Sequence, residues 1–226
     1  MKQFIKTSLL FLFIFSCSYS FGQNAIGVKF GGNLATWNGD EEILGGDPGS
    51  NLGFLFGGVF EINISDLISI QPELLYLQKG IKDETSFNDP IQGPLSSKSK
   101  ITLNYIELPI LLKLKFGDTQ GTNFFFTAGP SFGYAANGKS LFEFETVIDG
   151  ETIEDDIEFD DEDEFSRLEL SASLGAGVSF SVGPGKLFFE TRYLLGVTNL
   201  VDDETDSKIK NVGFSLSAGF LFSLGK

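Results

Sequence analysis

Two groups of charged residues in this 226-residue chain have the types and spacing that chemistry requires. The first group is five acids and five bases that stand singly within stretches of alternating apolar residues. Its members are Lys29, Glu61, Glu73, Lys79, Glu107, Lys113, Lys115, Glu169, Glu190 and Arg192. The second group is an acidic run between positions 143 and 164, with thirteen Asp and Glu residues and no Lys or Arg. Such carboxylates are candidates for acid–base catalysis, metal binding or ion pairing.

The residue types that the chain lacks restrict this chemistry. It has no His, which removes the commonest general base and metal ligand. A net charge of −15 without a basic patch argues against nucleic acid as a partner. We therefore expect a non-enzymatic protein without a cofactor, in which the first group forms a structural ion network rather than a catalytic pair.

The acidic run is open to three interpretations: a solvated loop tip, a site for divalent cations, or a docking surface for a basic partner. No EF-hand motif is present, so a cation site would be irregular. The carboxylates that could bind are Asp155, Asp156, Glu158, Asp160 and Asp161. Apolar residues interleave with these charges, which predicts a β-hairpin that extends the flanking strands, with its turn near Asp149 and Gly150. The edge of such a hairpin could capture another strand.

Alternation of apolar and small or polar residues is the pattern that must position both groups. It predicts eight strands, each long enough to cross a bilayer, which takes roughly 9–11 tilted residues. Their approximate ranges are 25–37, 52–63, 68–82, 101–116, 123–135, 167–182, 187–199 and 210–223.

The connections between these strands alternate between short and long, as they do in outer-membrane barrels. The long loops are predicted at 38–51, 83–100, 136–166 and 200–209, and they hold 24 of the 31 acidic residues. This sorting of charge indicates that the two rims face different compartments. The predicted fold is an all-β, eight-stranded antiparallel up-and-down transmembrane β-barrel.

In such a barrel the apolar face meets lipid and the ten strand charges point into the lumen. A charge on the lipid side would cost roughly 2–4 kcal/mol at the midplane, whereas inside it can pair. A soluble lipocalin-like barrel or sandwich would reverse the two faces, and periodicity alone does not separate them. Trp37 and Tyr134, which stand at strand ends beside long loops, are expected to form part of an interfacial aromatic girdle.

The N-terminal residues 1–22 are predicted to form a signal peptide. Lys2 and Lys6 precede an apolar stretch that is too short to span a membrane, and cleavage after Gly22 is expected. Lipoprotein processing at Cys17 is the alternative. The barrel domain then covers residues 23–226.

Several segments resemble the PorT-like outer-membrane β-barrel proteins of Bacteroidetes. The most specific is Asn104–Lys113 (NYIELPILLK), which is similar to a Tyr-Ile-Glu-Leu-Pro strand of that family. Residues 26–34, 71–76 and 126–133 resemble its first, third and Gly-Pro strands. The resemblance implies a Gram-negative outer-membrane location and a small OmpX-type barrel, and it implies little about activity.

The expected function is therefore that of an integral outer-membrane protein with a structural or partner-binding role. The main alternative is an accessory subunit for protein secretion across the outer membrane. A calcium-binding surface loop, a lipid-modifying enzyme and a small-solute pore rank lower. The expected partners are outer-membrane lipid, other envelope or secreted proteins, and divalent cations.

Overall fold

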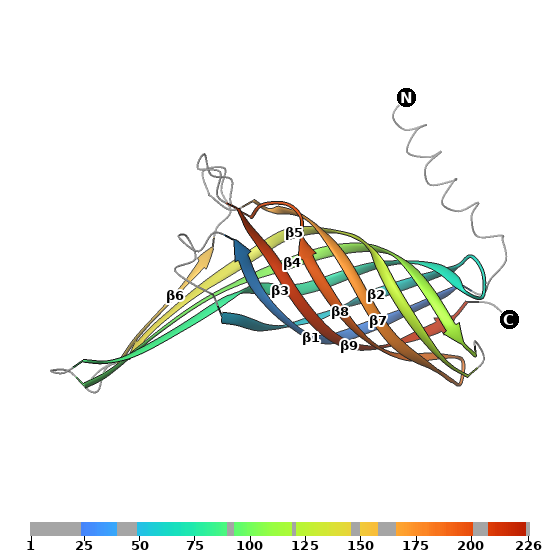
Figure 1. The fold of residues 1–226 in the computed structure, drawn as a ribbon, viewed down its shortest axis with the longest axis horizontal. Coiled ribbons are helices and arrows are strands. Elements are labelled where there is room, and N and C mark those ends of the chain that lie inside the picture. The colour runs from blue at the N-terminus through green and yellow to red at the C-terminus, as the bar shows by residue number, and fades with distance from the viewer. Residues whose placement is uncertain are drawn as a thin grey trace, which may run out of the picture.

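The computed structural model describes residues 24–39, 49–89, 93–118, 121–145, 150–157, 166–200 and 208–224. The regular structure in these ranges is nine β-strands (Figure 1). They are β1 (Ala25–Gly39), β2 (Gly49–Asn63), β3 (Ile68–Asp89), β4 (Gly93–Gly117), β5 (Thr122–Glu145), β6 (Gly150–Ile157), β7 (Leu168–Val182), β8 (Gly185–Gly196) and β9 (Ile209–Ser223). The described ranges contain no helix long and apolar enough to cross a membrane. The expected signal peptide lies outside them.

Eight of the strands close into a ring. Each ring strand pairs antiparallel with the ring strand next to it in the chain, and β1 pairs with β9 from Ala25↔Ser223 to Gly39↔Ile209 to complete the barrel. The ninth strand, β6, is not part of the ring, since its pairing is with β5. The up-and-down barrel of eight strands is confirmed, with one further strand beside it.

Three ring strands continue well past the barrel. β3, β4 and β5 have 22, 25 and 24 residues, whereas the other ring strands have 12 to 15. Their far halves form a hairpin of β3 with β4, on which β5 and then β6 pair. We call this four-stranded projection the extension sheet, formed by residues 81–89, 93–104, 137–145 and 150–157. It leaves the barrel at the end opposite the short turns (Figure 1).

The extension sheet corrects two sequence predictions. Within the predicted loop 83–100, residues 83–89 and 93–100 are strand and not loop. The predicted acidic loop at about 136–166 contains the end of β5 and all of β6. The hairpin expected there is present, but its second strand is the separate β6 rather than an extension of β7. Segment 83–100 has polar residues at both alternate positions, so apolar alternation gives no strand signal there, whereas the apolar residues of the acidic segment did predict its hairpin.

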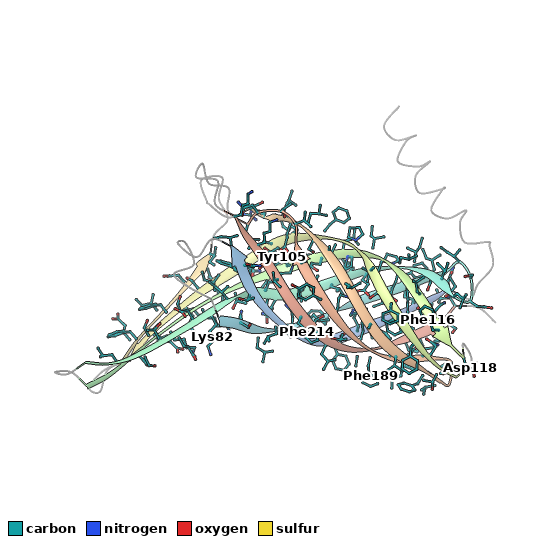
Figure 2. All side chains as sticks on the ribbon, viewed as in Figure 1. Lys82, Tyr105, Phe116, Asp118, Phe189 and Phe214 are labelled. Atoms are coloured by element: carbon teal, nitrogen blue, oxygen red, sulfur yellow. The ribbon has the colours of Figure 1, made fainter. Side chains whose placement is uncertain are left out.

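The two faces of the barrel wall are those of a membrane protein. Large apolar side chains project outward from every ring strand, as with Phe116, Phe189 and Phe214 (Figure 2). Val28 and Phe30 are 60% and 66% exposed, whereas Lys29 between them is buried. This arrangement excludes a soluble barrel with an apolar interior and confirms a transmembrane barrel.

One aromatic residue departs from the prediction. Tyr134 lies on the outward face, but Trp37 is buried inside the barrel against Leu103 and Tyr105. Trp37 has the same parity along β1 as Lys29 and Asn33, both of which face the lumen. Its position in the strand therefore makes it a core residue and not part of a girdle.

Candidate functional site

The ten charged residues that the sequence singles out all lie in the lumen. Each is at most 6% exposed, and all ten take part in ion pairs. They come from several different strands, so only closure of the barrel brings them together. They divide into a central, an upper and a lower cluster, where upper means nearer the extension sheet.

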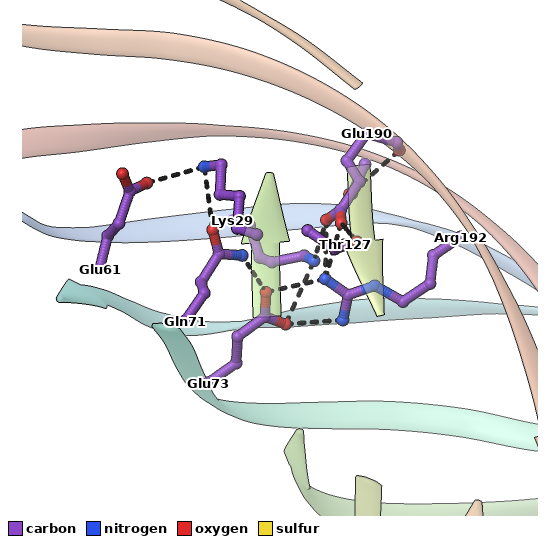
Figure 3. Close-up of polar contacts among 9 residues, drawn as sticks. Lys29, Glu61, Gln71, Glu73, Thr127, Glu190 and Arg192 are labelled. Atoms are coloured by element: carbon purple, nitrogen blue, oxygen red, sulfur yellow. Dashed lines mark hydrogen bonds and ion pairs between the residues drawn. The ribbon is translucent and has the colours of Figure 1, made fainter. Parts of the chain in front are cut away.

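The central cluster joins two carboxylates through two cations (Figure 3). Arg192 donates from Nη1 to Glu73 Oε2 and from Nη2 to Glu73 Oε1, each at 2.8 Å. Its Nη2 also lies 2.8 Å from Glu190 Oε2, and Lys29 Nζ lies 3.3 Å from Glu73 and 2.8 Å from Glu190. Thr127 donates to Glu190 Oε1 at 2.8 Å. The cluster is electrically neutral, and each charge has partners of the opposite sign.

The upper cluster has one cation for two carboxylates. Lys79 pairs with Glu107 and, at 3.0 Å, with Glu169. Ser131 donates to Glu107 Oε2 at 3.1 Å, and Asn211 donates to Glu169 Oε2 at 2.8 Å. Among the described residues Lys79 is therefore the one cation that pairs with these two carboxylates, and it balances only one of their two charges.

The lower cluster has the opposite balance, with two lysines around one carboxylate. Glu61 accepts from Lys113 at 2.7 Å and from Lys115 at 3.2 Å. Lys113 also lies 4.3 Å from the centroid of the Phe125 ring, a cation–π contact. Gln71 connects this cluster to the central one, because it accepts from Lys113 at 3.0 Å and donates to Glu73 at 2.6 Å.

Apolar side chains fill the lumen between and beyond these clusters. Three buried groups of apolar residues are present. They are Trp37, Leu103, Tyr105, Ala135, Leu200 and Ile209; Leu55, Leu77 and Leu194; and Ala25, Val59, Phe125, Phe188 and Leu221. Glycine makes room for the rings: a Cβ on Gly177 would lie 2.2 Å from Phe125 Cζ. The interior is a packed core, as expected for a barrel of eight strands.

Two of the five acidic-run candidates, Asp155 and Asp156, lie in β6. Asp155 and Asp156 are exposed, and as neighbours in a strand they point to opposite faces of the extension sheet. Glu158, Asp160 and Asp161 lie outside the described residues. Within the described residues no three acidic, His or Cys side chains converge as a metal site would require.

The outer face of the extension sheet carries lysines from segments that were predicted to be loops. Lys82, Lys98 and Lys139 pair with Glu84, Glu143 and Glu154, each at 2.6 Å. The hydrogen bond between Lys139 and Glu154 raises the pKa of Lys139 and lowers the pKa of Glu154. The sequence could have placed two of these lysines on the outer face, because Lys98 and Lys100 fall on the same alternate positions of β4 as the lipid-facing Ile106.

Comparison with known proteins agrees with this architecture. A family model described as an outer membrane protein beta-barrel domain matches residues 21–202. The chain is similar to the solved structure of the attachment invasion locus protein Ail of Yersinia pestis, with 15% identity, a TM-score of 0.43, and coverage of 89% of this chain and 100% of that one. The chain is also similar to Neisserial surface protein A, with 16% identity, a TM-score of 0.45, and coverage of 88% of this chain and 97% of that one. For the outer membrane protein OprG of Pseudomonas aeruginosa the identity is 11% and the TM-score 0.42, with coverage of 89% of this chain and 97% of that one. No curated protein matches the chain.

Proposed function

The chain belongs to the outer membrane protein beta-barrel domain family, and from this premise we propose that it is a non-enzymatic, partner-binding protein of the Gram-negative outer membrane. The barrel is the anchor and the extension sheet is the binding part. The partner is an extended, basic segment of another envelope or secreted protein, which adds as a strand to β6. The finer resemblance to the PorT-like proteins of Bacteroidetes stays a prediction that rests on residues 26–34, 71–76, 104–113 and 126–133, of which 104–113 is the most specific.

The lumen supports an anchoring role for the barrel. Its charges are satisfied by one another, and apolar layers lie between and beyond them. A transport path needs a hydrated route, and a catalytic pair needs carboxylates in different environments with access to substrate. The buried carboxylates are instead held by lysine, arginine and side-chain donors, which is the arrangement of a structural core.

The edge of β6 is the observation that carries the proposal. Among the described residues β6 pairs with β5 alone, so one edge of its eight residues presents backbone donors and acceptors without a strand partner. Such an edge accepts an added strand through main-chain hydrogen bonds, while its side chains decide which strand is accepted.

Charge on β6 defines the partner. Glu151, Glu154, Asp155 and Asp156 are exposed along its length, and Lys139 pairs with Glu154 and Asp156. Pairing with a second copy of β6 would place carboxylates opposite carboxylates, which destabilises a sheet. A strand with lysine or arginine at alternate positions would meet opposite charge instead.

Binding of a designed peptide to the full-length protein, folded in an uncharged detergent, tests this proposal. The probe is a fluorescent ten-residue peptide of alternating Lys and Thr, followed by anisotropy. We expect saturable binding that is lost when alternate peptide amides are N-methylated, since methylation removes the main-chain donors. Asp155→Lys should weaken binding, whereas Asp118→Lys makes the same charge change at the short-turn end and should not. Equal weakening by both variants, or full binding of the methylated peptide, would reject strand addition.

An accessory role in protein secretion is the specific form of this proposal in which the captured segment belongs to an exported protein. A photo-crosslinker at Ile153, which is 46% exposed on β6, tests it in cells. Recovery of exported proteins supports the secretion role, and recovery of resident envelope proteins supports a structural one.

Divalent cations are proposed as competitors for the same carboxylates, so millimolar calcium should weaken peptide binding.

A further inference from the structure

A polar pocket lies on the outer face of the extension sheet, just beyond the apolar belt of the barrel. Its volume is about 270 Å³, at the small end of ligand pockets. It is lined by Gln78, Lys100, Thr102, Asn104, Lys139, Leu141 and Glu154. Four strands contribute to it, so it exists only because β3, β4, β5 and β6 lie side by side there.

Strand register places these side chains on one face. Gln78 is opposite Asn104, Thr102 is opposite Lys139, and Leu141 is opposite both Lys100 and Glu154. Gln78 alternates with the lumen residues Leu77 and Lys79, which are buried. The pocket therefore continues the surface that meets lipid lower on the barrel, and not the surface of the lumen.

The pocket carries positive charge on a strongly acidic chain. Lys139 is paired with Glu154 at 2.6 Å and lies 3.8 Å from Asp156. Lys100 has no ion-pair partner among the described residues, although it lines the same pocket. Amide groups of Gln78 and Asn104 form the lower part, where Gln78 donates to Asn104 at 3.0 Å. The lining holds two ammonium groups, one carboxylate (Glu154) and neutral amides, while Asp156 lies beside Lys139 outside the lining. Lys100 is therefore the cation that gives the pocket its affinity for an anion.

The lower part of the pocket lies at the height expected for the headgroup layer, because Asn104 is only one alternate position above Ile106. The last outward apolar residue of β4 is Ile106, with Asn104, Thr102 and Lys100 following at alternate positions. The step from Ile106 to Lys100 is about 20 Å along the strand, or about 14 Å along the membrane normal at 45° tilt. Lysine side chains extend several ångströms back toward the interface. On the same face, the stacked rings of Phe54, Phe56 and Tyr76 mark the aromatic level below the pocket.

We propose that this pocket binds the phosphate of a phosphorylated lipid headgroup in the outer leaflet, with Lys100 and Lys139 as its cationic ligands. The ammonium group of Lys139 has three donors, so it can bind phosphate while it keeps its bond to Glu154. The acyl chains of the same lipid would lie against the outward rings below. Lipid binding would thereby hold the base of the extension sheet at the membrane surface.

Native mass spectrometry of the full-length protein in an uncharged detergent tests the site. The probes are phosphatidic acid, the matching diacylglycerol and inorganic phosphate. We expect saturable binding of phosphatidic acid that the Lys100→Gln, Lys139→Gln double variant weakens by about tenfold, as loss of charge-assisted hydrogen bonds implies. Lys98→Gln is the control, because Lys98 shares the face but pairs with Glu143 outside the pocket. Heat-modifiable gel mobility verifies that each variant is folded.

Three results would overturn the proposal. The first is equal binding of diacylglycerol, because the phosphate would then contribute nothing. The second is equal weakening by Lys98→Gln, because the effect would then be one of general charge. The third is displacement of phosphatidic acid by inorganic phosphate at similar concentration, because the ligand would then be a soluble anion rather than a lipid.

Discussion

Removal of Lys79 should destabilise the barrel far more than removal of Lys29, although both are buried lysines that bridge two glutamates. Lys79→Met leaves Glu107 and Glu169 without a cation, since each of them pairs with Lys79 in the structure. Lys29→Met leaves Glu73 and Glu190 still bound to Arg192, with the bidentate contact to Glu73 intact. Both substitutions replace a buried lysine by methionine, so they differ only in whether the two glutamates keep another cation.

The magnitude follows from the partners that are left. Breaking a buried ion pair by removing one partner costs about 3–5 kcal/mol, because it leaves an uncompensated buried charge. We expect Lys79→Met to lie in this range, since Ser131 and Asn211 supply only one neutral donor each to the two carboxylates. Loss of Lys29 removes hydrogen bonds to charged groups that retain another cation, for which about 1–3 kcal/mol is appropriate.

Denaturant titration of detergent-folded protein, followed by Trp37 fluorescence and by gel mobility, measures both costs. Trp37 is the only tryptophan, and it packs in the same apolar group as Tyr105, over whose ring Lys79 lies at 4.7 Å. The compensating variant is Lys79→Met with Glu107→Gln and Glu169→Gln, which removes the stranded charges and should recover much of the lost free energy of unfolding.

Equal costs for Lys79→Met and Lys29→Met would refute the reasoning, because the charge balance of each cluster would then have no influence on stability. Failure of the triple variant to recover stability would point instead to lost packing of the long lysine side chain.

Three further outcomes are expected. Gly177→Ala should destabilise the barrel by about 1–3 kcal/mol in the same titration, because its methyl group would clash with the Phe125 ring and with the backbone oxygen of Phe189. Outward Gly32→Ala should be nearly neutral, because the nearest atom to its methyl group is 4.0 Å away. The pKa of Glu154, measured by NMR, should be lower than that of an ordinary glutamate because of its hydrogen bond to Lys139. This bond therefore stabilises the extension sheet fully above the pKa that Glu154 has in the unfolded chain, and the stabilisation is lost as pH falls through the lowered pKa of the folded protein. Lys139→Gln should return the pKa of Glu154 to its ordinary value. Planar bilayers should show no steady conductance, because the paired charges and the apolar layers between and beyond them fill the lumen; a steady conductance would contradict the packed core.

The sequence by itself determined the wall of the barrel and the direction of its charges. Alternation has a period of two, as does the side-chain direction in a strand, so each charge between apolar neighbours has one possible side. The same argument places Trp37 inside, and the interfacial position expected for it ignored that parity. The absence of His and the single Cys17 likewise limit the catalytic chemistry open to the chain, whatever its fold.

Only the tertiary structure decided which charges meet. Lys79 and Glu169 are ninety positions apart, and their pairing depends on the stagger of strands around the closed ring, which periodicity does not specify. The strands within 83–100 were also beyond the sequence pattern, because a segment that is polar at both alternate positions has no apolar period. The hairpin of β5 and β6 was predicted, because apolar residues interleave with the charges there. The pocket lined by Lys100 and Lys139 needs β3, β4, β5 and β6 side by side. The register of these strands is set by pairing between segments that are distant in the sequence, and not by the sequence of any single strand.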